Sequence, residues 1–323
     1  MFNRMGRLVL GFVAATIALA ANAAEQPYPT KAVRFIVPFA PGGATDLLAR
    51  IIGEKLAASL GQPFVVENRP GAATQIGAQL VARSEPDGYT LLMATSTTLA
   101  INASLYSKLQ YDPVKDFAPI SLVVTQPFVL LVNPQLPVQS VQDLIALAKS
   151  KAGQLTYASA GSGSFAHLTM ALLQSMTGID VVHVPYKGSA PALVELMGGQ
   201  VSMMFDNTAL NLVKAGKLRA LGVSTRNRLA VMPDVPTLSE AGVPGYDMAA
   251  WQGVVAAAGT PRPVIDKLNA EIVRLLRLAD VQARLAADGW SVTTSSPDRF
   301  AAYIASEIGR YAKIVKDAGA RVE

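Results

Sequence analysis

Residues 120–134 read ISLVVTQPFVLLVNP, a long apolar stretch that Pro127 interrupts. The stretch is too long for one ordinary strand, because strands in globular proteins rarely exceed about 10 residues. A chain that leaves one sheet and enters another would show this pattern. We therefore predict that the chain crosses here from one α/β lobe into a second one.

Short apolar runs alternate with helical stretches before this crossing. The pattern predicts strands at 33–39, 63–69 and 89–95, with helices over about 45–60 and 71–81 between them. Such an alternation is typical of βαβ units, and continuous apolar strands favour a parallel sheet covered on both faces.

A second α/β set follows the crossing, and then the chain returns. WQGVVAAAG (251–259), which comes after the Pro- and Gly-rich residues 233–245, is predicted to be the return strand. The other predicted elements are strands at 155–159, 181–186, 201–206 and 218–224 and helices at 141–151, 165–176, 190–197, 263–277 and 297–318. The sequence thus predicts a discontinuous first lobe, residues 24–124 and 247–323, and an inserted second lobe, residues 125–246.

The first 23 residues have the pattern of a secretory signal peptide. Arg4 and Arg7 precede an apolar run, Leu8–Ala20, and Ala21-Asn22-Ala23 is typical of a cleavage site. The chain has no cysteine, which excludes a lipid anchor on a cysteine, disulfides and thiolate chemistry. We expect an exported protein without a membrane span.

Charge and composition exclude several classes of function. The formal net charge is +5, and removal of Arg4 and Arg7 with the acid-free residues 1–23 leaves +3. The basic residues are scattered, whereas nucleic-acid binding needs clustered Lys and Arg. With no cysteine and two histidines, we expect no metal site and no cofactor.

Four polar turns follow predicted strands, where open α/β sheets bind ligands. The first lobe contributes two turns, with Phe39, Ala40, Gly42, Gly43, Ala44 and Thr45 in the first and Ser96, Thr97 and Thr98 in the second. The second lobe contributes Gly161, Ser162, Gly163 and Ser164, which lead into a helix with His167, and then Tyr186, Lys187 and Gly188. Each turn alone is also typical of a helix cap, but together they favour a ligand-binding cleft.

These residue types favour a small anion. Glycine lets backbone N–H groups approach a ligand, a following helix directs its unpaired N–H groups at it, and hydroxyls add donors. The first turn lacks the Lys-Ser/Thr of a phosphate-binding P-loop and does not match G-x-G-x-x-G.

The sequence contains no convincing catalytic group. Ser164 and His167 are the one candidate pair for a serine hydrolase, but residues 161–165 read GSGSF and not G-x-S-x-G. His183 lies within an apolar strand, and we expect it to be structural with a hydrogen-bond partner. Asp206, at the end of a strand, is the acid expected nearest the cleft, and binding of loop N–H groups is an equally good role for it.

The mature sequence resembles the substrate-binding receptors of tripartite tricarboxylate transporters, the Bug family. The resemblance rests on blocks that span essentially the whole mature chain: YPTKAVRFIVPFAPGGATD (28–46), VVENRPGA (65–72), PDGYTLL (86–92), YDPVKDFAPISLV (111–123), LTYASAGSGS (155–164), VHVPYKGSAPAL (182–193), FDN (205–207), AGKLRALGVST (215–225) and PDVPTLSEAGVPGY (233–246).

The resemblance implies a two-lobed periplasmic-binding-protein fold of the Venus-flytrap type (type II) with a crossover hinge. It implies a periplasmic receptor, not an enzyme, that encloses a small carboxylate between its lobes and presents it to a membrane permease. The two turns of the first lobe would hold one carboxylate, and the far end of the ligand would meet the second-lobe turns, His167 and Asp206. A sensor that presents a carboxylate to a membrane signalling partner remains an alternative. The segment TALNLVK (208–214) is shorter than is usual in the family, and Phe165 is larger, so the distal pocket is expected to differ.

Overall fold

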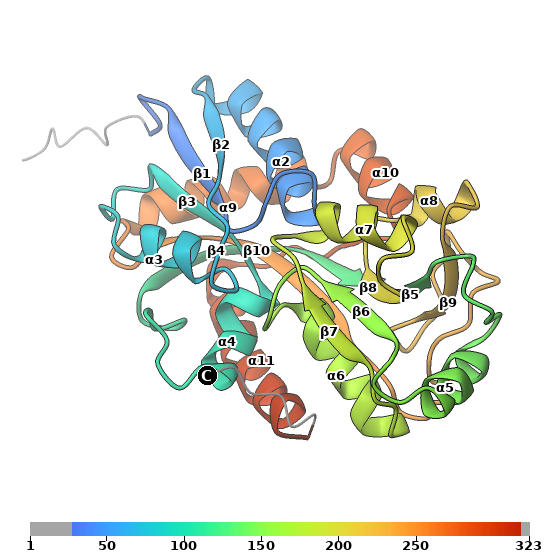
Figure 1. Cartoon of the computed structure of the whole chain (residues 1–323). Coiled ribbons are helices and arrows are strands. Elements are labelled where there is room, and N and C mark those ends of the chain that lie inside the picture. Colours follow the sequence, from blue (N-terminus) through green and yellow to red (C-terminus); the bar gives the residue numbers. More distant parts are fainter. Residues whose placement is uncertain (1–27, 318–323) are drawn as a thin grey trace, which may run out of the picture. The chain divides into compact units, whose positions relative to one another are not determined.

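The computed structural model describes residues 28–317 of the chain, so the predicted signal peptide lies outside the described residues. Lys31 begins the compact unit described below. This unit contains two mixed α/β sheets (Figure 1). No described helix is both long and apolar enough to cross a membrane.

The first sheet has six strands in the order β11-β4-β10-β3-β1-β2. Their bounds are β1 Val33–Val37, β2 Phe64–Asn68, β3 Thr90–Thr95, β4 Phe117–Pro127, β10 Ala249–Ala257 and β11 Ser291–Val292. β1 is parallel to β2 and β3, but β10 is antiparallel to β3 and β4. The sheet is therefore mixed where the sequence predicted parallel strands, because the return strand β10 runs opposite to the strands of the βαβ units.

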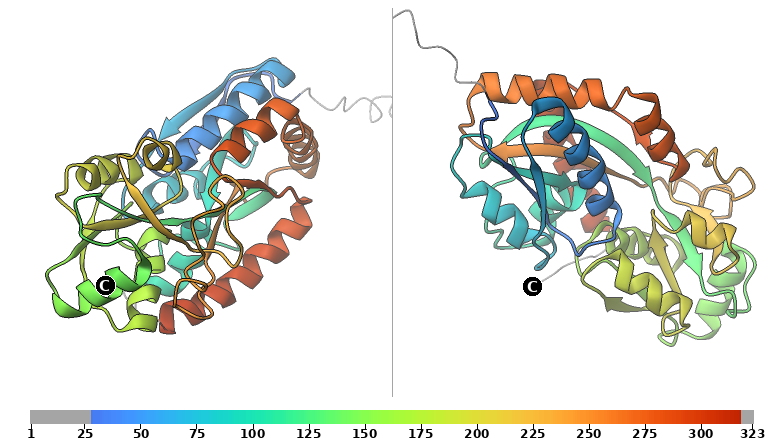
Figure 2. Two further views of the ribbon diagram at one scale, coloured as in Figure 1. Left: turned by 90° about the vertical axis from the view of Figure 1, so that its right-hand side faces the viewer. Right: turned by 90° about the horizontal axis from the view of Figure 1, so that it is seen from above.

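Helices cover both faces of this sheet and lie along its edge. They are α2 Ala44–Leu60, α3 Gln75–Ala82, α4 Asn102–Leu105, α9 Arg262–Leu275, α10 Ala279–Ala287 and α11 Pro297–Asp317, and a turn of π-helix, Thr97–Ile101, leads into α4. The helix α11, red in Figure 2, runs past α4 and β4 to reach α6 of the second sheet. Its buried face repeats at helical spacing, with Phe300, Ile304 and Tyr311 each at most 2% exposed.

The second sheet has five strands in the order β7-β6-β8-β5-β9, with β5 antiparallel to both of its neighbours. The strands are β5 Val129–Val132, β6 Thr156–Ser159, β7 Val182–Pro185, β8 Met203–Asp206 and β9 Arg219–Val223. The helices of this part of the chain are α5 Val141–Ser150, α6 Phe165–Thr177, α7 Ser189–Met197 and α8 Leu210–Lys214.

The chain passes from one sheet to the other at a single residue, Phe128, between β4 and β5. Ser224 joins this crossing to the return segment: its hydroxyl accepts from the Phe128 N–H at 2.9 Å and donates to the Met248 carbonyl at 2.6 Å. The structure confirms that residues 120–134 cross from one α/β sheet into another.

Two local predictions differ from the structure. The predicted helix over 71–81 is wrong in its first turn, because α3 begins at Gln75 and Ala72, Ala73 and Thr74 have φ angles of 44°, 47° and 77°. The turn after β3 is helical from Thr97 onward, which the polar sequence Thr95–Thr98 did not predict. Several apolar residues follow it, and Leu99, Ala100 and Ile101 are all fully buried.

Candidate functional site

The N-terminus of α2 has no side-chain cap. Gly43 is its N-cap residue, with an extended backbone (φ −88°, ψ 176°), and no side chain accepts a hydrogen bond from the first turn. The backbone N–H groups of a first helical turn have no partner within the helix, and the positive end of the helix dipole lies there. The residues Gly43, Ala44 and Thr45 line a cavity, so these donors lie where an anion can reach them.

Asp46 fixes the shape of this turn without entering the cavity. Its carboxylate accepts hydrogen bonds from the Gly42 N–H at 3.0 Å, from Arg50 at 2.9 Å and from Asn68 at 2.9 Å. Burial raises the pKa of Asp46, but these hydrogen bonds, above all that from Arg50, outweigh burial and hold the pKa below its usual value. The negative charge next to the helix start is thus neutralised by an ion pair.

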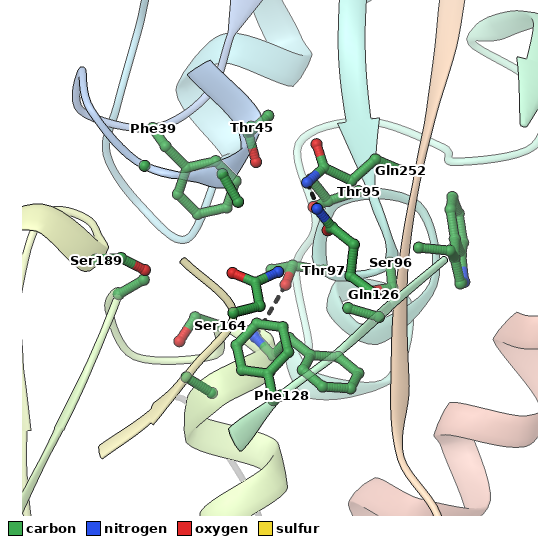
Figure 3. A pocket seen from close by; sticks show the side chains of 18 of the residues that line it. Phe39, Thr45, Thr95, Ser96, Thr97, Gln126, Phe128, Ser164, Ser189 and Gln252 are labelled. Atoms are coloured by element: carbon green, nitrogen blue, oxygen red, sulfur yellow. Dashed lines mark hydrogen bonds between the residues drawn. The ribbon is translucent and has the colours of Figure 1, made fainter. Parts of the chain in front are cut away.

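The end of β3 forms the opposite wall. The Thr95 and Thr98 hydroxyls are 3.1 Å apart, which holds Thr98 in the buried layer beneath the cavity. The Thr97 hydroxyl instead accepts a hydrogen bond from the Phe165 N–H at 3.0 Å, as the dashed line in Figure 3 shows. Phe165 begins α6, so this bond joins the turn after β3 to a helix of the second sheet.

The cavity between these walls has an empty volume of about 550 Å³, which includes its opening to solvent. Eight predicted site residues line it: Phe39, Ala40, Gly43, Ala44, Thr45, Ser96, Thr97 and Ser164. None of the described residues that line it carries a charge. A charged ligand held here would be bound by neutral donors.

A second cavity shares Phe39, Thr97 and Ser164 with the first one, so the two adjoin. The predicted residues Gly161, Ser162, Tyr186 and Lys187 line this second cavity. The remaining predicted residues, Gly42, Thr98, Gly163, His167, Gly188 and Asp206, line neither of the two. The structure thus brings three of the four polar turns to the first cavity, and the fourth contributes Tyr186 and Lys187 to the second one.

Asp206 lies fully buried behind the cavity wall. Its Oδ1 accepts hydrogen bonds from the Thr208 N–H at 2.6 Å and from the Thr208 hydroxyl at 2.7 Å. Burial raises the pKa of Asp206, and the bonds from Thr208 oppose that shift only in part. Of the two roles expected for this acid, the structure shows the binding of a loop N–H group.

Ser164 and His167 do not form the nucleophile and base of a hydrolase. The Ser164 hydroxyl caps α6 by accepting from the His167 backbone N–H at 3.3 Å, and the imidazole Nδ1 accepts from the Gly163 N–H at 3.0 Å. A general base must instead bind the hydroxyl of the nucleophile with its ring nitrogen.

The sequence did not point to several residues of the cavity. Gln126, Phe128 and Gln252 lie on or beside the crossing strands, and Asn207 follows a strand of the second sheet. Ser189, which the sequence places at the end of the polar turn after residues 181–186, also lines the cavity. The one available signal was Gln126, a polar residue within the apolar run 120–134. Phe165, expected to change the distal pocket, lines the cavity with its ring centroid 4.7 Å from that of Phe128.

Comparison with known proteins agrees with this geometry. Residues 48–320 match the family model described as the tripartite tricarboxylate transporter family receptor.

Three similar solved structures have the same fold. An R. palustris protein, Rpa4515, solved with adipate, is 38% identical with a TM-score of 0.89 over 91% of this chain and 100% of that one. The periplasmic binding protein BugD is 35% identical with a TM-score of 0.88 over 92% and 100%. MatC from Rhodopseudomonas palustris, solved with malate, is 38% identical with a TM-score of 0.86 over 89% and 100%. The two sheets thus form a periplasmic-binding-protein fold.

Proposed function

The chain belongs to the tripartite tricarboxylate transporter receptors, a family of non-enzymatic solute receptors, and from that premise we propose that it captures a small carboxylate and delivers it to a membrane permease. The relatives solved with adipate and malate bind carboxylates of this kind. In this proposal the protein acts in the periplasm after removal of residues 1–23.

One observation carries the proposal. The uncapped start of α2 and the hydroxyl-rich end of β3 line the same cavity, and no described residue that lines it is charged. A carboxylate is an acceptor only, so it suits a site built from N–H and O–H donors. Hydrogen bonds to a charged group contribute about 1.5–3 kcal/mol each, and a few of them suffice without a salt bridge.

Closure of two lobes completes capture. We assign residues 24–124 and 247–323 to the first lobe and 125–246 to the second, with the hinge at the segments near 122–128 and 246–251. Two hydrogen bonds already join the turns across the cleft: Phe165 N–H to the Thr97 hydroxyl at 3.0 Å, and Ala40 N–H to the Lys187 carbonyl at 3.3 Å. A ligand that contacts both walls favours the closed state through those contacts.

Gly43→Val and Thr97→Val test the carboxylate site. A Cβ atom at Gly43 would meet no atom within 4 Å, so the valine would keep the fold and occupy the space in front of the helix N-terminus. We expect titration calorimetry with adipate and malate to show affinity reduced at least about 10-fold by Gly43→Val, and by about 5–10-fold by Thr97→Val, which removes one hydroxyl.

Gly309→Val is the matched control, because a Cβ there also meets no atom within 4 Å and Gly309 lies exposed on α11, outside the cleft. Affinities for adipate and malate that are equal in all four proteins would exclude these two turns from the binding site.

A further inference from the structure

Two glutamines lie side by side at the bottom of the cleft. Gln126 is on β4 and Gln252 on β10, and they are 1% and 3% exposed. The Gln252 Nε2 donates to the Gln126 Oε1 at 2.7 Å, and Figure 3 shows the two side chains directed at each other beside Thr95. Both line the cavity.

Each of these amides keeps one polar atom without a protein partner. The Gln126 Nε2 and the Gln252 Oε1 are buried and have no hydrogen-bond partner among the described residues. Buried amide atoms are normally hydrogen-bonded, because their desolvation is costly. Two unpaired atoms on neighbouring side chains that line the proposed binding cavity therefore point to a ligand group.

The hydrogen bonds that the two glutamines offer to a ligand group do not depend on which way each amide is oriented. One N–H···O bond joins the two side chains, so one amide is left with a free NH₂ and the other with a free oxygen. Reversal of both amides exchanges the two roles and leaves the same pair. The glutamines thus offer one donor and one acceptor together.

A hydroxyl is the smallest ligand group that both accepts and donates. A carboxylate only accepts, an ammonium only donates, and a methylene does neither. Gln252 is also the strand partner of Thr95, which is adjacent to the turn proposed to bind the carboxylate. A hydroxyl that reaches the two glutamines would therefore be on the carbon next to the bound carboxylate.

We propose that Gln126 and Gln252 bind the hydroxyl of a 2-hydroxycarboxylate, and that this pair makes the receptor selective for hydroxylated carboxylates. The inference rests on the proposed function of the same cleft and names the class of ligand.

The test compares ligands that differ only at this carbon. Calorimetry is done with the wild-type mature protein, Gln126→Met and Gln252→Met. Each enantiomer of malate is compared with succinate and with aspartate, and each enantiomer of 2-hydroxyadipate is compared with adipate. We expect one enantiomer of malate or of 2-hydroxyadipate to bind the wild type at least about 10-fold more tightly than the ligand without the hydroxyl, and malate more tightly than aspartate. In both methionine variants the ratio of the two affinities should fall to near one.

Gln282→Met is the matched control, since Gln282 is exposed on α10, and the preference for the hydroxylated ligand should persist in it. Thermal unfolding shows which methionine variants are folded, and one folded variant is sufficient for the test. Equal affinity of the wild type for hydroxylated and unhydroxylated ligands, or a preference that survives substitution, overturns the hydroxyl site and leaves the carboxylate receptor standing. If none of the ligands binds the wild type, the proposed function fails and the hydroxyl site fails with it.

Discussion

His183 packs against two other rings, those of Tyr157 on β6 and His167 on α6. Its ring centroid is 4.7 Å from that of Tyr157 and 4.3 Å from that of His167, and the rings are nearly parallel. Its Nε2 is 2.7 Å from the Ser159 hydroxyl, which confirms the expected structural role with a hydrogen-bond partner. His167, expected to contact the ligand, is in the same stack and accepts from the Gly163 N–H. The two histidines thus support the Gly161–Ser164 turn through hydrogen bonds to Ser159 and to the Gly163 N–H.

This stack predicts a loss of stability in mild acid. Burial lowers the pKa of both histidines, and burial together with the charge of His167 lowers that of His183 to about 4. An unfolded histidine has a pKa of about 6.5, so between pH 6.5 and 4 the unfolded chain binds more protons than the folded chain. The free energy of unfolding therefore decreases as the pH is lowered through this range.

His183→Gln should weaken that decrease, as measured by thermal unfolding at pH 7, 6, 5 and 4.5. The chain has only one other histidine, His167. An identical decline in the variant would contradict the assignment. Asp206, whose raised pKa acts in the opposite direction, is unchanged in both proteins.

Single residues also show which parts of the site a sequence pattern can predict. Gly43 and Thr97 were predictable because a glycine or a hydroxyl directly after an apolar strand is typical of a turn that caps a helix or binds a ligand. Gln126 and Gln252 were not, since they lie within strands far apart in the chain and meet only because β4 pairs with β10. A sequence pattern shows where a strand ends more readily than which side chains meet across a sheet.

At the scale of elements, the loop before α3 shows a local pattern overridden by tertiary contacts. Ala72, Ala73 and Thr74 have left-handed backbones, which cost a non-glycine residue roughly 1–2 kcal/mol each. Asn102 of α4 holds the loop: its Nδ2 donates to the Ala73 carbonyl at 2.8 Å and lies 3.1 Å from the Tyr111 hydroxyl. The apolar spacing of 71–81 predicts a helix, and nothing in it reveals a partner on a later element.

Asn102→Ala should therefore destabilise the protein. It leaves the Ala73 carbonyl and the Tyr111 hydroxyl with fewer partners in a buried region, and we expect the free energy of unfolding to fall by about 1–3 kcal/mol. Urea unfolding measures the change. The matched control is Asn211→Ala at an exposed position of α8, where the expected change is within about 0.5 kcal/mol. Equal losses in the two variants would mean that Asn102 does not hold the loop.

At the scale of the whole unit, glycines lie where the turns of the two sheets meet. A Cβ added to Gly163 would lie 2.6 Å from Leu105 Cδ2 and 3.4 Å from Ala73 Cβ. A Cβ added to Gly188 would lie 3.3 Å from Ala40 Cβ. The sequence predicted these glycines as ligand contacts, whereas the structure places them against residues that flank the first sheet. The close approach of these neighbours to the glycine backbones gives a second reason for glycine there.

Gly163→Ala tests whether this close approach is needed for closure. Gly178 is the matched position, because its φ of 69° is close to the 79° of Gly163, but a Cβ there meets no atom within 4 Å. Both substitutions carry the cost of a left-handed alanine, about 1 kcal/mol, and should lower the melting temperature to a similar extent. Only Gly163→Ala places a methyl group against Leu105 and Ala73, so in the proposed two-lobe mechanism only it should disfavour the closed state. We expect calorimetry to show at least about 5-fold weaker carboxylate binding in Gly163→Ala than in Gly178→Ala, because a receptor that closes less readily binds with lower apparent affinity. Small-angle scattering should show a radius of gyration that decreases less in Gly163→Ala when ligand is added at saturation. Equal affinities and equal compaction in the two variants would mean that the lobes need not approach this closely to hold the ligand.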